Sequence, residues 1–158
     1  LPKSVSREVA GRSASGRENG IVISYGFGDI AYGFGDSLDR HFVTDGREGR
    51  DEEVPYFMTF YGDSMELTDP VPAEAEITVV AQHPAGAIFD DGTNRSAEGY
   101  IQAAAVEYGA GRVYVSSEAA TFSAQIATRG GLMGFNDPDA PYNKQYLLNI
   151  IHWLDHLD

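Results

Sequence analysis

Cysteine is absent from all 158 residues of the chain. The chain therefore cannot form disulfides, thiolate metal sites or a cysteine nucleophile. This absence fits the cytosol, and it equally fits an exported protein that needs no covalent cross-links. No segment approaches the roughly 18 consecutive apolar residues of a membrane helix, and no signal peptide is visible. We expect a soluble protein, cytoplasmic or exported, without a membrane partner.

Basic residues are scarce, with eleven Lys and Arg against 24 Asp and Glu, for a net charge of −13. Residues 1–50 hold seven of each sign, whereas residues 51–158 hold four basic and seventeen acidic side chains. Nucleic-acid binding depends on Lys and Arg that neutralise phosphates, so we expect no nucleic-acid partner. The acidity is explained most simply by solubility, and a cationic ligand is the alternative.

The remaining composition is that of one globular domain, with 42% hydrophobic and 11% aromatic residues. Residues 1–20 are rich in Ser, Gly and Arg and lack apolar periodicity, which predicts an irregular arm. Residues 21–158 are predicted to form a single α/β domain. Because the chain begins at Leu1 rather than Met, we expect a processed product or a piece of a longer protein.

Short β-branched and aromatic runs predict a strand-rich chain. The predicted strands are Ile21–Tyr25, Tyr56–Tyr61, Glu76–Gln82, Tyr100–Tyr108 and Arg112–Ser116, with a short one at Ala87–Phe89. The Gly-Ala-Gly sequence between the fourth and fifth of these is typical of a hairpin. The near-repeat YGFGD, at Tyr25–Asp29 and Tyr32–Asp36, predicts one glycine-rich loop or hairpin rather than a repeat architecture.

Two helices are predicted near the carboxyl end. One covers residues 119–129, followed by a loop over 130–141. The other closes the chain, where apolar residues recur at three- and four-residue spacings: Tyr146, Leu147, Ile150, Ile151, Leu154 and Leu157. Asn143 or Asp139 is predicted to cap its start. The fold class is therefore a layered α/β domain, strand-rich, with a long C-terminal helix and few helices that could cross between parallel strands.

Two segments resemble a known family. YGAGRVYVSSEAATFSAQ, from Tyr108, is similar to GKGRVVVLGEAAMxxAQ in a group of uncharacterised bacterial proteins related to DUF4350. MGFNDPDAPYNKQYLLNIIHWL, from Met133, is similar to GMNxPGxDNxQxxLNIMHWL of the same group. Three upstream patches resemble it more weakly: GRENG, GRDEEV and TFYGDSM. The resemblance implies a class I glutamine-amidotransferase-like (flavodoxin-like) fold, as a variant or a carboxy-terminal portion.

The chain departs from this family in two ways. Nothing corresponds to the amino-terminal βαβ portion, and SSEAAT stands where the group has GEAAM. The glutamine amidotransferases use a cysteine nucleophile with a His–Glu pair near the last strand, and this chain has no cysteine. Their chemistry is therefore excluded. Glu118 falls in the region that carries that pair.

Glu118 is the leading catalytic candidate, since a carboxylate at a strand's carboxyl end can act as an acid, a base or a ligand. The alternative is that Glu118 accepts backbone N–H bonds of the next segment. A glycosidase would need a second carboxylate, which Asp36, Asp63 or Glu66 could supply, and Asp63 is the one we select. The motifs GDSL at Gly35–Leu38 and GDSM at Gly62–Met65 resemble those of GDSL esterases. They make Ser37 a candidate nucleophile, but the Asp-x-x-His block of those enzymes is missing.

Ligand-binding candidates are Gln125, Asn136 and Ser117, which could line a pocket beside Glu118. His152 and His156 are four residues apart, a spacing that can chelate a metal, but no third ligand accompanies them. The acidic loops at residues 90–92 and 137–139 are explained by turn formation as well as by calcium binding. We expect no metal and no cofactor.

Two functions are compatible with these features. The first is a non-catalytic binding or interaction module for an unknown small molecule or protein, because an incomplete sheet leaves an unpaired edge or apolar face. This interpretation also predicts a homo-oligomer. The second is a small hydrolase, either a glycosidase built on Glu118 or a GDSL-like esterase.

Overall fold

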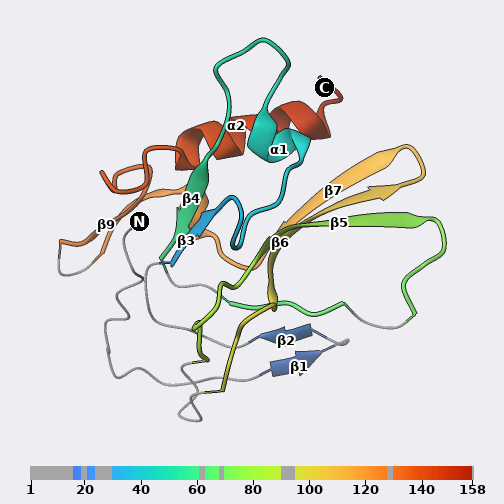
Figure 1. Ribbon diagram of the computed structural model, residues 1–158, viewed down its shortest axis with the longest axis horizontal. Coiled ribbons are helices and arrows are strands. Elements are labelled where there is room, and N and C mark those ends of the chain that lie inside the picture. The colour runs from blue at the N-terminus through green and yellow to red at the C-terminus, as the bar shows by residue number, and fades with distance from the viewer. Residues whose placement is uncertain are drawn as a thin grey trace.

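The computed structural model describes residues 16–18, 21–23, 30–60, 63–67, 70–89, 95–127 and 130–157 (Figure 1). The elements run in the order β1 (Gly16–Glu18), β2 (Ile21–Ile23), β3 (Ile30–Gly33), α1 (Phe42–Asp45), β4 (Tyr56–Thr59), β5 (Ala75–Gln82), β6 (Ile101–Tyr108), β7 (Gly111–Ser116), the 3-10 helix η1 (Ala120–Phe122), β8 (Ala124–Ile126), β9 (Leu132–Gly134) and α2 (Asn143–Leu154). The predicted α/β class is confirmed. The first YGFGD copy, the turn at residues 90–94 and residues 1–15 of the predicted arm lie outside the described residues.

Every pairing between the named strands is antiparallel, and one isolated parallel bridge joins Phe34 to Leu38. Three pairs, β1–β2, β3–β4 and β8–β9, form two-stranded sheets, and β5–β6–β7 form a three-stranded sheet. The predicted hairpin between β6 and β7 is confirmed, and its turn places Gly109 at a φ of +60°. This conformation favours glycine because it lacks a Cβ.

Helix α2 covers one face of the three-stranded sheet, which we call the inner face. Ala103, Ala105 and Tyr114 of this face belong to the main apolar core, together with Tyr146 and Trp153 of α2. A column of rings runs through that core: Tyr32 stacks on Phe57 at 5.0 Å and Phe57 on Tyr146 at 4.3 Å between ring centroids. The guanidinium of Arg112 donates to the Trp153 carbonyl oxygen at 2.7 Å, which fastens β7 to the end of α2.

The helix predicted over residues 119–129 is wrong. The chain makes one 3-10 turn, η1, and then strand β8, which pairs with β9 inside the predicted loop over 130–141. Gly134 explains the change, because its φ of +63° brings it against the carbonyl oxygens of Ala120 and Ser123. The amide of Phe135 then donates to Ser123 O at 2.6 Å, which holds β9 against the end of η1.

The closing helix is confirmed at Asn143–Leu154, but its predicted cap is wrong. Tyr142 occupies the N-cap position without a side-chain hydrogen bond, and Asn143 is the first helical residue. The buried Asn143 amide instead serves β4: Oδ1 accepts from Met58 N and Nδ2 donates to Met58 O, both at 2.9 Å. A side-chain amide therefore substitutes for a neighbouring strand and fixes the start of α2 on β4.

Three further elements have no counterpart in the predictions, and the first of them, β1, lies inside the predicted irregular arm. Strand β3 lies at the second YGFGD copy, where Tyr32 pairs with Phe57 of β4. Helix α1 begins at Phe42 and is capped by His41, whose ring accepts from Val43 N while Thr44 Oγ1 accepts from His41 N.

Candidate functional site

Glu118 lies directly after β7 and is buried. One carboxylate oxygen accepts from Ala120 N at 2.5 Å, and the other accepts from Thr121 N at 2.8 Å and from the Thr121 hydroxyl. Because both oxygens bind the first N–H groups of η1, the carboxylate holds the turn that redirects the chain from β7 to β8. This geometry is that of the capping alternative.

Asp63 lies in the segment that follows β4, next to the loop that carries Glu118. Ser117 joins the two loops, because its hydroxyl donates to Asp63 O at 2.7 Å and its carbonyl oxygen accepts from Asp63 N at 3.3 Å. Burial, and next the charge of Glu118, raise the pKa of Asp63 from 3.8 to about 6. Among the described residues, Asp63 Oδ1 has no hydrogen-bond partner. The structure therefore brings together Asp63, Ser117 and Glu118 of the predicted site residues.

A second polar group, which the sequence analysis did not single out, lies next to this loop pair. Ser64 Oγ lies 2.6 Å from His83 Nε2, and His83 Nδ1 lies 2.8 Å from the Tyr32 hydroxyl. Ser64 is 3% exposed, His83 5% and Tyr32 0%. We call Ser64, His83 and Tyr32 the buried relay.

Burial lowers the pKa of His83, so its ring is neutral at pH 7 and carries one proton. When that proton is on Nδ1, it bonds Tyr32, Tyr32 donates to Gln102 Oε1 at 3.3 Å, and Nε2 accepts from Ser64. When the proton is on Nε2, it points to Ser64 and to the Asp63 carbonyl oxygen at 3.2 Å. In both arrangements His83 links β3 to the loop after β4, and only the first gives Ser64 a base.

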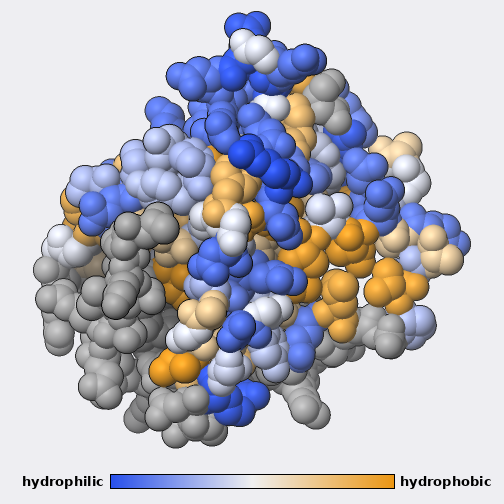
Figure 2. Space-filling view, in the orientation of Figure 1, coloured by the Kyte–Doolittle hydropathy of each residue, from blue (hydrophilic) through white to orange (hydrophobic). Residues whose placement is uncertain are grey.

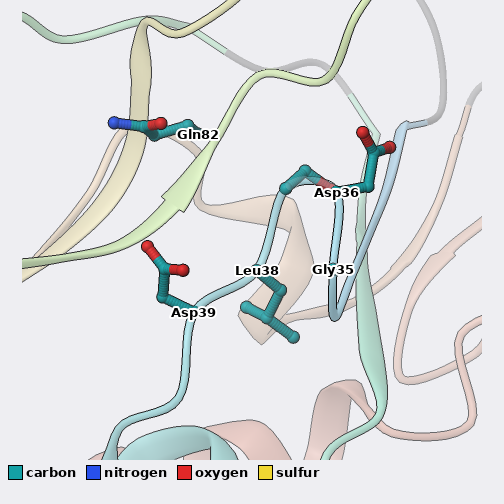
Figure 3. Close-up of a pocket in the computed structure, with 6 residues that line it drawn as sticks. Gly35, Asp36, Leu38, Asp39 and Gln82 are labelled. Atoms are coloured by element: carbon teal, nitrogen blue, oxygen red, sulfur yellow. The ribbon is translucent and has the colours of Figure 1, made fainter.

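Ser37 lies elsewhere, in a hollow of about 270 Å³ lined by Gly35, Asp36, Ser37, Leu38, Asp39 and Gln82 (Figure 3). Its hydroxyl accepts from Gly33 N at 3.2 Å, which closes the turn after β3. The Asp36 and Asp39 carboxylates point in different directions in Figure 3. None of the lining residues is a histidine, so the hollow does not give Ser37 the histidine base of a serine esterase.

Gln125 and Asn136 lie at the exposed β8–β9 hairpin, where Asn136 Nδ2 donates to Gln125 O at 3.5 Å. Ser117 alone of the three ligand candidates contacts the Asp63 and Glu118 loops. The structure therefore does not gather Gln125, Asn136 and Ser117 around one pocket within its described part. No group of three acidic or histidine side chains suited to a metal occurs among the described residues either.

The outer face of the three-stranded sheet is the face turned away from α2. The register places two cross-strand rows on it. The rows are Val79, Ala104 and Val115, and Ile77, Val106 and Val113. Val113 is 52% exposed and Val115 38%, although both belong to the largest sheet. Figure 2 shows an apolar patch in the region of this sheet on a surface that is mostly hydrophilic.

The buried relay could have been found in part from the sequence, because Ser64 lies in the GDSM motif and His83 directly follows a predicted strand. No family model, curated protein or solved structure matches this chain. No helix within the described residues is both long enough and apolar enough to cross a membrane.

Proposed function

We propose that this chain is a non-catalytic interaction module that binds a partner through the outer face. The observation that supports the proposal is the composition of that face. An antiparallel sheet with one face in water normally alternates apolar and polar residues along each strand. Here both rows are entirely apolar while Val113 and Val115 are substantially exposed. Contiguous exposed apolar surface is the feature by which interaction sites are recognised.

The arrangement of Glu118 supports the same proposal. Its two oxygens already bind Ala120 and Thr121, so a role as nucleophile or base would require breaking bonds that hold η1. Asp63 does have the raised pKa of a general acid, but a glycosidase needs a second free carboxylate.

We further propose that the domain is a variant or a carboxy-terminal portion of the amidotransferase-like fold. The order of hairpin, Glu118 loop and closing helix supports this, since it follows the order of the segments that carry the resemblance. The absence of cysteine makes the proposed variant a binding one rather than an amidotransferase.

A small hydrolase is the second candidate, and the 2.6 Å contact between Ser64 and His83 favours it. With the proton on His83 Nδ1, Nε2 would take the Ser64 proton while Oγ attacks an ester carbonyl, and would then pass that proton to the leaving alcohol. Against this role, Ser64 and His83 are almost completely buried, so a substrate reaches them only if the loop after β4 moves.

A panel of chromogenic esters and glycosides separates the two candidates. It is run on wild type, Glu118→Gln and Ser64→Ala, with circular dichroism to verify folding. The module proposal predicts that no substrate is turned over faster by wild type than by the two variants. Turnover that is lost in folded Ser64→Ala would establish the esterase, and turnover lost only in Glu118→Gln would establish the glycosidase.

A further inference from the structure

Helix α2 carries apolar side chains on two opposite sides. Its buried side, with Tyr146, Ile150 and Trp153, packs in the main core. Leu148 and Ile151 point the other way and are 39% and 49% exposed. At about 100° per residue their directions lie roughly half a turn from that of Trp153, so the core that holds α2 does not cover them. The outward side of a surface helix is normally polar.

This outward side is bounded by two opposite charges. Four residues at spacings of four, three and four follow one line along the helix, and we call them the α2 stripe: Lys144, Leu148, Ile151 and Asp155. Lys144 and Asp155 are exposed, and neither forms an ion pair with another of the described residues. The α2 stripe therefore runs from a positive end through an apolar centre to a negative end.

The α2 stripe is complementary to itself when a second copy runs in the opposite direction. A two-fold axis midway between Leu148 and Ile151 sets Leu148 against Ile151 of the partner subunit. The same axis sets Lys144 against Asp155 of the partner subunit, because both positions lie about 8 Å from it along the helix. Each contact then occurs twice, as in the isologous dimers that are the commonest homo-oligomers. A parallel pair would set each charge against its own kind.

Size and net charge set the strength of this pair. The 12 residues of α2 span about 18 Å and a helix is about 10 Å wide, a footprint well short of the roughly 800 Å² that a stable interface buries on each partner. The net charge of −13 also repels a second copy. At about 0.1 M salt this repulsion is screened beyond about 10 Å, whereas partly buried contact pairs are screened much less. We therefore expect a weak and reversible dimer.

We propose that α2 is the interface of a weak homodimer, in which the two helices pack antiparallel through the α2 stripe. The occupant is a second copy of the chain, because the stripe itself supplies the apolar centre and the opposite charges that it requires of a partner. This inference goes beyond the proposed function and does not depend on it. Since α2 covers the inner face, the dimer leaves the outer face of each subunit free, and a bivalent partner would gain avidity.

Charge reversal tests the antiparallel arrangement, with sedimentation velocity of the full chain between about 10 and 500 μM as the measurement. Lys144→Glu and Asp155→Lys each set like charges together at both ends of the interface, and each is expected to weaken the dimer at least about fivefold. The double variant is expected to restore the wild-type affinity. Unspecific charge effects predict the opposite for Asp155→Lys, which makes the chain less acidic. Both changes suit the dipole of α2, and circular dichroism verifies folding.

A second pair of variants tests the apolar centre. Ile151→Gln replaces an exposed apolar side chain of α2 by a polar one that suits a helix. Ile126→Gln is the control, because Ile126 lies on β8 and is 69% exposed. We expect the dimer to weaken at least about tenfold in Ile151→Gln and to remain unchanged in Ile126→Gln.

The possible results separate this dimer from the docking function of the outer face. Wild type that stays monomeric at about 500 μM would overturn the dimer. A double charge variant that does not recover would overturn the antiparallel arrangement, and a dimer that Ile151→Gln leaves intact would overturn α2 as its interface. A dimer lost in folded Val113→Thr but kept in Ile151→Gln would place the second copy on the outer face, which overturns this inference and not the proposed function.

Discussion

Asp63 and His83 respond to pH in opposite directions although their loops touch. The pKa of Asp63 is raised in the folded chain, so folding favours its protonated form and the protein loses stability as pH rises from about 4 to 6. The pKa of His83 is lowered, so the protein loses stability as pH falls below the ordinary histidine value of 6.5.

The variant Asp63→Asn removes the acidic half of this response. We expect it to stabilise the protein by about 1 kcal/mol at pH 7, once the partial exposure of Asp63 is discounted, and to change little at pH 4. Urea denaturation at the two pH values measures the difference. A variant that is less stable than wild type at pH 7 would contradict the assigned burial and the proximity of Glu118.

Asn143 is the residue whose role departs most from its predicted one. The variant Asn143→Ala leaves the N–H of Met58 without its partner and removes one of the two donors to Met58 O, the other being the Thr121 hydroxyl, at a cost of about 1–3 kcal/mol in unfolding free energy. The exposed Asn136→Ala is the control and should change it by less than about 0.5 kcal/mol. Equal values from chemical denaturation of the two variants would show that the Met58 contact contributes nothing.

At the scale of elements, η1 and the β8–β9 hairpin depend on one glycine. A Cβ at Gly134 would lie 1.9 Å from Ser123 O and 2.3 Å from Ala120 O, and the φ of +63° adds strain. Gly134→Ala is expected to destabilise the protein by at least about 3 kcal/mol in thermal or urea unfolding. Gly130→Ala is the control, because its φ of +81° is similar but no atom lies within 4 Å. A loss as large at Gly130 would mean that strain, not the close approach, sets the cost.

The elements that periodicity specifies were predictable. The β6–β7 hairpin and α2 have strong local patterns, and both were placed to within a residue or a few. Residues 119–129 were not, because short apolar runs suit helix and strand alike and the outcome depends on Glu118 and Gly134. The cap of α2 was missed because Asn143 binds Met58, which is 85 residues away.

The candidate site was predictable only where its residues are neighbours in sequence. Glu118 and Ser117 follow one strand, and their place could be read from it. The buried relay joins residues 19 and 51 positions apart, and no local pattern encodes such contacts. The outer face could be predicted in part from the sequence of β6. Its run Ala103–Val106 is apolar at every position, so both faces of the strand are apolar, a pattern typical of strands that are covered on both faces.

At the scale of the whole molecule, apolar patches, one of them in the region of the three-stranded sheet, interrupt a mostly hydrophilic surface (Figure 2). Helix α2 and the core occupy one side of the three-stranded sheet. The buried relay and Glu118 hold the segments that adjoin the ends of β5 and β7. These polar groups hold the fold. Apolar side chains remain exposed on the outer face, at Val113 and Val115, and also on α2, at Leu148, Ile151 and Leu154.

The most direct test of the docking face is the binding of Nile red, an uncharged dye that becomes fluorescent on apolar surfaces. It is titrated against wild type, the double variant Val113→Thr with Val115→Thr, and the control Ile126→Thr. Our account predicts strong fluorescence with wild type and with the control, and loss of most of it with the folded double variant. Fluorescence that the double variant retains in full would contradict the assignment of the outer face as the docking surface.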